Sequence, residues 1–267
     1  MTAVLFPAGA RGAVFVPGSA SGGRELGALD PGHVAGEVHG FCLSGGSAFG
    51  LATADGVMEV LESRGIGYDT GVARVPIVPT AILFDLPVAK VRPGQREGRL
   101  AARTASTAPL AEGRVGAGAG CTVAKNTGEP EPGGFGGCSK AVLNWTVATG
   151  VAVNSLGSVF NPFSGAWVAG GTPRTGEVGD WRGNTTLAVV VTDAPLDRAG
   201  AGVVAKMASA GFARTLYPAF SPFDGDTIFV ASTGAGTPVG PAELLAIGQA
   251  AATCVTLAIL RGVGPTG

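Results

Sequence analysis

Residues 183–196 read GNTTLAVVVTDAPL, and this stretch decides the fold. Its centre, Leu187 to Val191, is a continuous apolar run, which is typical of a strand that is covered on both of its faces. A polar segment with a glycine leads into the run, and a helical pattern begins after it near Pro195. A buried strand that is flanked by helices predicts a layered α/β domain.

Three helices are expected in this domain. Each has apolar residues at helical spacing and a recognisable start or stop signal. They span about residues 46–64, 195–210 and 241–261, with Gly65, Gly211 and Gly262 after their ends and Asp193 as the cap of the second. The expected apolar stripes are Leu51, Ala54, Met58 and Leu61; Leu196, Ala199, Val203, Met207 and Ala210; and Leu244, Ile247, Ala251, Cys254 and Ala258.

Further strands are expected between the helices, at residues 13–16, 81–86, 141–149, 150–159 and 228–232. Two segments are expected to be mobile surface. Residues 93–112 are polar and basic, and residues 172–183 combine glycine, proline and mixed charges. A chain of 267 residues is long enough for one large domain, and we expect a single domain over residues 1–267.

The composition excludes several classes of function. Only 14% of the residues are charged and the net charge is -1, whereas a globular average is about 25% charged, so disorder is excluded for most of the chain. Because there is no run of Lys and Arg, no nucleic-acid partner is expected. The four cysteines form no CxxC pair and there are two histidines. We therefore expect no disulfide framework, no metal site and no cofactor.

Two stretches of the sequence indicate where in the cell the protein is expected. Residues 1–18 have no basic region followed by an apolar run, so no secretory signal is expected and the cytoplasm is the expected location. Residues 244–260 carry no charge, but this stretch is shorter than the roughly 20 apolar residues that span a bilayer. We expect a buried core helix there and no membrane partner.

Chemistry is expected at the junction between Asn184 and Thr185. If the chain is cut there, Thr185 becomes a new N-terminus whose hydroxyl is a nucleophile and whose own amine is the base. A free α-amine has a pKa of about 7.7 to 8.0, which suits proton transfer near neutral pH. No histidine is needed for this chemistry. The competing interpretation of the local sequence is a strand entrance with an asparagine in a turn.

Three blocks of the sequence, in the same order along the chain, resemble a known family. They are Pro7-Ala8-Gly9-Ala10, residues 41–51 (FCLSGGSAFGL) and residues 187–196 (LAVVVTDAPL). The chain is similar to the DmpA-like L-aminopeptidase/D-esterase family of self-cleaving N-terminal-nucleophile hydrolases. In its site residues it is most similar to the NylC-type nylon-oligomer hydrolases of that family. The resemblance implies a four-layer αββα sandwich, as in the ornithine acetyltransferases, a homo-oligomer (tetramer or larger), and autocleavage into residues 1–184 and 185–267.

The resemblance also assigns roles to individual residues around the cut. Thr185 matches the nucleophile, and Asn184 matches the residue on the other side of the scissile bond. Asp224 and Asp226 match a pair of acidic residues beside the nucleophile, where a carboxylate orients the hydroxyl and the ammonium. The alternative for Asp224-Gly225-Asp226 is a tight hairpin turn.

Lys125, Asn154 and Phe49 complete the expected site. Lys125 matches a lysine that lowers the pKa of the nucleophile or binds developing negative charge, and its alternative is a surface lysine that ends a strand. Asn154 matches the asparagine of the oxyanion hole, and its alternative is a turn asparagine. Phe49 is expected in the substrate pocket, where relatives have a tyrosine, so a phenolic donor is absent from this chain.

The expected function is that of a self-processing N-terminal threonine amidohydrolase. Its acyl-enzyme forms on Thr185, and its substrates are small peptides, amino-acid amides or 6-aminohexanoate (nylon) oligomers. Two alternatives stay open, an acyltransferase of the ornithine acetyltransferase type and a non-enzymatic relative that kept the fold. A thiol nucleophile at Cys42 or Cys138, with His39 nearby, competes with the commoner role of cysteine as a small buried hydrophobe.

Overall fold

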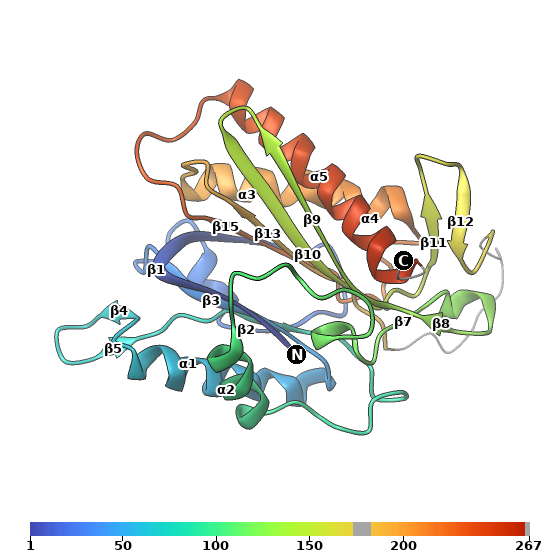
Figure 1. The fold of residues 1–267 in the computed structure, drawn as a ribbon, viewed down its shortest axis with the longest axis horizontal. Helices are drawn as coiled ribbons and strands as arrows, with labels where there is room; N and C mark the ends of the chain where they lie inside the picture. The colour runs from blue at the N-terminus through green and yellow to red at the C-terminus, as the bar shows by residue number, and fades with distance from the viewer. Residues whose placement is uncertain (173–182, 265–267) are drawn as a thin grey trace.

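An eight-stranded sheet forms the centre of the computed structural model, which describes residues 1–172 and 183–264 (Figure 1). The strand order is β2-β6-β3-β1-β15-β13-β10-β9. The strands are β1 (Thr2–Phe15), β2 (Gly22–Arg24), β3 (Val38–Ser44), β6 (Thr80–Ile82), β9 (Gly134–Val142), β10 (Trp145–Val153), β13 (Leu187–Thr192) and β15 (Thr227–Ser232). The apolar run therefore forms a central strand, as predicted. Of the expected surface segment 172–183, residues 173–182 lie outside the described residues.

The long strand β1 belongs to both halves of this sheet. Residues 2–5 and Ala10 pair with β3, with a register shift between Leu5 and Ala10, and residues 11–15 pair with β15. The two halves stack on each other around a shared apolar core. In that core the ring of Phe41 from β3 lies on the ring of Phe229 from β15, with 4.6 Å between the ring centroids.

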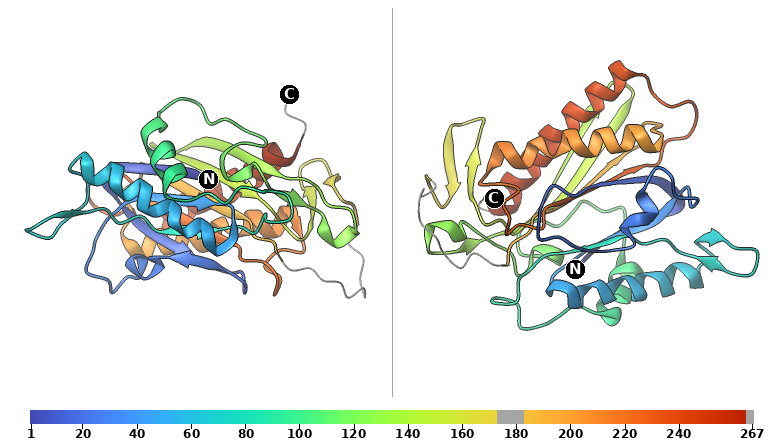
Figure 2. Two further views of the ribbon diagram at one scale, coloured as in Figure 1. Left: turned by 90° about the horizontal axis from the view of Figure 1, so that it is seen from below. Right: turned by 180° about the vertical axis from the view of Figure 1, so that it is seen from behind.

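Helices cover the outer face of each half. They are α1 (Thr53–Ser63), α2 (Gln95–Thr104), α3 (Arg198–Ala208), α4 (Ala210–Thr215) and α5 (Pro241–Val263). Helices α1 and α2 pack on the half that contains β3, whereas α3, α4 and α5 pack on the half that contains β13. Figure 2 shows the two groups of helices on opposite sides of the strands. The predicted four-layer αββα sandwich is confirmed.

Short strands lie at the two ends of the sandwich (Figure 1). They are β4 (Tyr68–Asp69) with β5 (Arg74–Val75), β7 (Thr122–Val123) with β8 (Glu131–Pro132), and β11 (Ser158–Asn161) with β12 (Ala166–Ala169) and β14 (Leu216–Tyr217). Edge-to-face contacts join Phe160, Trp167 and Tyr217 on the three-stranded group.

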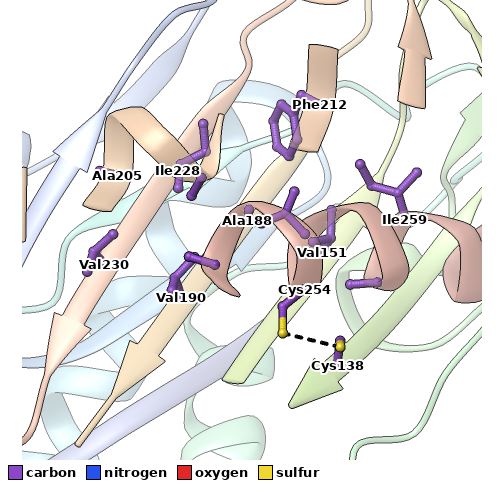
Figure 3. Packing of buried hydrophobic residues seen from close by; sticks show 14 of the residues in the cluster. Cys138, Val151, Ala188, Val190, Ala205, Phe212, Ile228, Val230, Cys254 and Ile259 are labelled. Carbon is purple, nitrogen blue, oxygen red and sulfur yellow. Dashed lines mark hydrogen bonds between the residues drawn. The ribbon is translucent and has the colours of Figure 1, made fainter. Parts of the chain in front are cut away.

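Helix α5 forms one wall of the larger apolar core (Figure 3). Its Cys254 and Ile259 face strand residues such as Val151. The sulfur of Cys254 lies 3.3 Å from the sulfur of Cys138 on β9, so the helix and this edge of the sheet are in direct contact. Full burial of one side chain such as Val151 or Ile259 stabilises a fold by about 1.5 to 3 kcal/mol.

By length and composition alone, α5 is also the one described helix that is long and apolar enough to cross a membrane. Of the most apolar 18-residue stretch of this helix, 56% is buried inside the protein. Four of the five expected stripe residues are fully buried, namely Ile247, Ala251, Cys254 and Ala258. The prediction of a core helix at this position agrees with this packing.

The second expected helix is wrong in its start, end and phase. Helix α3 begins at Arg198 and is capped by Asp197, whose Oδ1 accepts a hydrogen bond of 2.7 Å from the N–H of Gly200. Val203, expected in the buried stripe, is 40% exposed. Leu196, the first residue of the expected stripe, lies before the helix, and the buried face of α3 is formed by Ala201, Val204, Ala205 and Ala208 instead. The helix does not stop at Gly211, since that residue is buried within α4.

The other differences arise at turns and at helix contacts. The predicted break between residues 149 and 150 is wrong, because β10 runs unbroken from Trp145 to Val153. The chain turns earlier, at Leu143, whose φ is 53°. Residues 93–112 contain α2 and are not simply mobile surface. This helix packs on α1 through Gly56 and Gly98, where an added Cβ would lie 1.9 Å from a backbone oxygen of the other helix. The first expected helix begins as a 3-10 turn, η2 (Ser47–Ala52), and ends at Gly65 as predicted.

Candidate active site

Thr185 lies two residues before β13, at the place where this strand meets the loop that leads into β15. The two strands are parallel, and Leu187 is opposite Thr227, so this topology brings Asp224 and Asp226 beside Thr185. The N–H of Gly225 donates a hydrogen bond of 3.1 Å to Oγ1 of Thr185. The predicted nucleophile and acidic pair therefore come together from segments that are about forty residues apart.

The backbone at Thr185 is strained. Its φ is +149°, a region that β-branched residues rarely adopt, and such conformations cost about 1 to 3 kcal/mol. The residue is 2% exposed, and its N–H donates a hydrogen bond of 2.9 Å to the carbonyl oxygen of Asn154. The surrounding structure thus holds Thr185, the residue that follows the Asn184–Thr185 bond, in an unfavourable backbone conformation.

Asn154 is buried immediately after β10, and its carboxamide is fixed at both ends. Its Oδ1 accepts hydrogen bonds from the N–H of Thr122 at 3.0 Å and from Nζ of Lys125 at 3.3 Å. Its Nδ2 donates to the carbonyl oxygen of Phe84 at 3.0 Å. One N–H of this amide is not used by these bonds, and the residue is fully buried.

The ammonium of Lys125 turns inward, although the residue follows the end of β7 as the sequence suggested. Nζ donates to the carbonyl oxygens of Thr122 at 2.8 Å, Ser155 at 3.1 Å and Asn154 at 3.2 Å. Burial lowers the pKa of Lys125 to about 8, against the opposing effect of nearby acidic groups. An ammonium with this pKa gains or loses its proton near neutral pH.

Asp224 and Asp226 are each 1% exposed and are held by main-chain donors. The Oδ1 of Asp226 accepts from the N–H of Thr186 at 2.7 Å, and its Oδ2 accepts from the N–H of Phe220 at 3.1 Å. Burial, with a smaller contribution from Asp224, raises the pKa of Asp226 to about 7. Burial also raises the pKa of Asp224. Two such carboxyls retain a proton at a pH where exposed ones have lost it.

A cavity of about 360 Å³ opens beside the scissile bond. It is lined by Ala20, Ser47, Ile82, Phe84, Gly183, Asn184, Thr185, Pro222 and Phe223. Both sides of the bond thus face the same space. Among the described residues, no charged side chain lines this cavity.

Phe49 lies outside this lining. Its ring is 57% exposed, and the guanidinium carbon of Arg92 stands 4.0 Å from the ring centroid. The structure therefore places Phe49 on the surface, stacked with a cation, and not among the residues around Thr185.

Two contacts of the site were not predicted from the sequence. The hydroxyl and the N–H of Ser221 both donate to Oδ2 of Asp224, the hydroxyl through a very short hydrogen bond. Gly225 positions the hydroxyl of Thr185 as described above. Serine is a common turn residue, which is the only signal of Ser221 in the sequence. The sequence indicates a turn at Gly225 but not its contact with Thr185.

The cysteines and metal ligands offer no second catalytic site in the described part of the chain. All four cysteines are buried, and burial raises the pKa of Cys42 to about 12, so its thiol stays protonated. Among residues 1–172 and 183–264, no group of three or more His, Cys, Asp or Glu residues is placed to hold a metal ion.

Known proteins resemble this chain in sequence and in fold. An uncharacterized aminopeptidase of Mycobacterium tuberculosis is 39% identical over 300 residues, covering 98% of this chain and 85% of the relative. A 6-aminohexanoate-oligomer endohydrolase of Kocuria sp. is 28% identical over 255 residues, which cover 87% of this chain and 68% of the relative. The solved structure of the L-aminopeptidase D-Ala-esterase/amidase of Ochrobactrum anthropi is described as a variant of the Ntn hydrolase fold. It superposes with a TM-score of 0.70 at 18% identity, and the match covers 95% of this chain and 72% of that one.

The family assignment follows from the sequence match over the whole chain. The model of peptidase family S58 matches residues 1–265, and the resemblance inferred from the three sequence blocks is thereby confirmed. The chain belongs to peptidase family S58 and is an amide-bond hydrolase.

Proposed function

We propose that this hydrolase is made as a precursor that cuts its own chain between Asn184 and Thr185, and that the freed Thr185 is its nucleophile. The observation that carries the proposal is the hydroxyl of Thr185, which is held by the N–H of Gly225 on a residue whose own backbone conformation is strained. Cleavage relieves that strain. It also creates the α-amine that a threonine nucleophile uses as its base.

Self-cleavage proceeds in two steps. The Oγ1 of Thr185 attacks the carbonyl carbon of Asn184 and gives up its proton, for which the buried Asp224/Asp226 pair is the acceptor. The C–N bond then breaks, the nitrogen takes a proton and becomes the amine of Thr185, and an ester links Asn184 to Oγ1. Water hydrolyses this ester, which leaves a carboxylate on Asn184 and restores the hydroxyl of Thr185.

The mature site repeats this chemistry on an external amide. Departure of Asn184 opens the cavity to the acyl part of the substrate, and the amine of Thr185 takes the proton from its own hydroxyl. The free N–H of Asn154 and the ammonium of Lys125 stabilise the developing oxyanion. One such preorganised donor contributes about 3 to 4 kcal/mol to transition-state stabilisation.

The proposed substrates are small peptides, amino-acid amides and linear amide oligomers. The names of the relatives from Mycobacterium tuberculosis and Kocuria sp. support amide substrates of this range. Transfer of the acyl group to an amine, as in an ornithine acetyltransferase, is the alternative to transfer to water, and the assay below distinguishes the two.

A hydrolysis assay tests this function. Wild-type protein and the Thr185→Ala variant are incubated with a panel of amino-acid and fatty-acyl p-nitroanilides, with and without acetylornithine plus glutamate. The proposal predicts release of nitroaniline by the wild type alone and no exchange of acetyl groups. Acetyl exchange without hydrolysis would replace hydrolysis by acyl transfer, and hydrolysis by the Thr185→Ala variant would rule out this nucleophile.

Assembly and compartment are part of the same proposal. We expect a homo-oligomer of four or more chains in the cytoplasm, and the exposed aromatic side chains of Phe163, Trp167 and Tyr217 are candidates for its interface. Light scattering coupled to gel filtration gives the mass in solution, and a monomer would contradict this expectation.

A further inference from the structure

Cys138 and Cys254 form a pair of thiols that the proposed chemistry at Thr185 does not use. Their sulfur atoms lie 3.3 Å apart, although the residues are 116 positions apart in the sequence. Figure 3 shows the two side chains pointing toward each other, Cys138 from the edge strand β9 and Cys254 from α5. A disulfide bond is about 2.05 Å long, so the two sulfurs need to approach by about 1.2 Å to form one.

The main chain on both sides of this pair is held close. A Cβ added to Gly136 would lie 2.0 Å from the carbonyl oxygen of Ala258, so the glycine allows α5 to lie directly on β9. The Nη1 of Arg261 donates a hydrogen bond of 2.8 Å to the carbonyl oxygen of Gly137. Both contacts lie within about two helical turns of Cys254. They hold the helix against the strand and therefore keep the two sulfurs together.

The other two cysteines lie in different parts of the core. Cys121 belongs to the apolar core between the two sheet halves, and Cys42 belongs to the cluster beneath α1, whereas Cys138 and Cys254 share the larger core beneath α5. The thiol of Cys121 donates to the carbonyl oxygen of Ala117 at 3.3 Å. A disulfide formed within the folded chain is therefore expected between Cys138 and Cys254.

Cys138 is the thiol that is nearer to solvent. It is 7% exposed, whereas Cys254 is fully buried. It is also the last buried residue before the tip of the β9–β10 hairpin, where Ser139 and Lys140 are exposed. Burial raises the pKa of Cys254 to about 12, so this thiol is protonated at neutral pH. A small oxidant that enters at the hairpin tip thus meets Cys138 first.

We propose that Cys138 and Cys254 are a modification site, an oxidisable pair of thiols that closes to a disulfide when hydrogen peroxide reaches it. The two residues lie on opposite sides of the bond between Asn184 and Thr185. In the mature enzyme the disulfide therefore joins the two chains covalently, and a small thiol such as glutathione restores the open pair. The link between chains rests on the proposed self-cleavage, whereas the disulfide itself does not.

The reaction consumes one molecule of peroxide for each disulfide. The sulfur of Cys138 loses its proton and attacks one oxygen of the peroxide, the O–O bond breaks, and the departing hydroxide takes up that proton as water. The sulfur of Cys254 then attacks the sulfur of the resulting sulfenic acid. The S–O bond breaks, and the second hydroxide leaves as water with the proton of the Cys254 thiol. The two sulfurs lose two electrons, which reduce the peroxide.

Peptide mapping tests the disulfide whether or not the chain is cut, and it needs no substituted cysteine. Wild type and Thr185→Ala are treated with a small excess of hydrogen peroxide, remaining thiols are blocked with iodoacetamide, and both are digested with trypsin without reductant. Trypsin cuts after lysine and arginine, so Cys138 and Cys254 fall in the peptides 126–140 and 215–261. We expect these peptides to be joined, two hydrogens below their summed mass, and to separate on reduction.

Two outcomes of this mapping would overturn the inference. One is a linked peptide that contains Cys42 or Cys121. The other is a peroxide-treated protein in which Cys138 and Cys254 are both recovered as blocked thiols or as irreversibly oxidised acids, with no linked peptide.

Denaturing gels of the wild type test the link between the chains. Without reductant, the peroxide-treated mature enzyme is expected to run as one species near 26 kDa. With dithiothreitol it should run as two species of about 18 and about 8 kDa. Cys138→Ser and Cys254→Ser should give the two smaller species in both lanes. Cys42→Ser is the matched control and should behave as the wild type.

The gels also separate this inference from the proposed function. A wild-type enzyme that is cut, and that still separates into its two chains without reductant after peroxide treatment, would overturn the inference. A wild-type chain that stays uncut even after reduction would count against the proposed self-cleavage instead, and the joined peptides would still decide whether the disulfide forms.

Discussion

The N–H of Gly225 donates a hydrogen bond of 3.1 Å to the hydroxyl oxygen of Thr185. This hydrogen bond joins the glycine between two buried aspartates to the residue that lies two positions before the central strand β13. Because the oxygen accepts this hydrogen bond, its own hydrogen is free to leave toward a base, and a lone pair can point at the neighbouring carbonyl carbon. This contact links the fold most directly to the proposed chemistry.

Gly225 should therefore tolerate no side chain. An added Cβ would lie 2.5 Å from Oγ1 of Thr185, so Gly225→Ala displaces the hydroxyl. We expect self-cleavage to slow by about 10²-fold, as for other small misplacements of reacting atoms. Gly202→Ala is the matched control, because an added Cβ there meets nothing within 4 Å. The time course of cleavage on a denaturing gel measures both, and equal rates would refute the role of this contact.

The rate of self-cleavage should depend on pH through two groups. The acidic pair must release a proton to act as base, and the pKa of Asp226 is about 7, so the rate rises as the pH approaches this value. The ammonium of Lys125 has a pKa of about 8 and stabilises the oxyanion only while it is protonated, so the rate falls above that pH. A bell-shaped profile between these limits is expected.

Lys125→Arg isolates the alkaline side of that profile, because arginine stays protonated throughout this range. The variant is expected to be slower, since its fork does not reproduce the four contacts of the ammonium, and its rate should no longer fall above pH 8. A quench-flow or gel assay from pH 5 to 10 measures it. Retention of the alkaline limb in Lys125→Arg would assign that limb to another group.

Asn154 should act mainly on the transition state. Asn154→Ala removes the free amide donor, and kcat of the mature enzyme is expected to fall by about 10²- to 10³-fold with little change in KM. Asn144→Ala, in the exposed turn between β9 and β10, is the control for the loss of an asparagine. A change in KM alone would mean that Asn154 binds substrate without stabilising the oxyanion.

Phe49 should contribute little to turnover. Its ring is 57% exposed under Arg92 and does not line the described cavity, so a phenolic hydroxyl at this position has no reacting atom within its surroundings. We expect kcat/KM of Phe49→Tyr to stay within about 2-fold of the wild type, which is below the 10²-fold effect of a true oxyanion donor. A gain of that larger size would place position 49 in the site after all.

The sequence predicts some of these features well because their causes are local. The run from Leu187 to Val191 is apolar on both faces, and only a strand between two layers satisfies it. Helix α5 is delimited by a proline and a glycine, and its stripe is continuous. The buried face of α3 could not be predicted this way, because Leu196 is buried in the same core although it lies before the helix begins at Arg198.

The site residues show the same division. Thr185, Asp224 and Asp226 are recognisable through a family resemblance that includes their neighbours in sequence. Phe84 has no local signal, because its carbonyl oxygen accepts a hydrogen bond from Asn154, seventy residues later, and its ring lies where a side chain at Gly183 would be. Such contacts are set by the stacking of the two sheet halves and become visible only in three dimensions.

The mass of the purified, reduced chain under denaturing conditions tests the central claim most directly. Cleavage before Thr185 predicts two species of about 18 and about 8 kDa from the wild type, as an N-terminal nucleophile requires, and a single species of 26.2 kDa from Thr185→Ala. A wild-type chain that stays at 26.2 kDa under conditions in which it hydrolyses amides, or a Thr185→Ala chain that is still cut at this bond, would contradict the account.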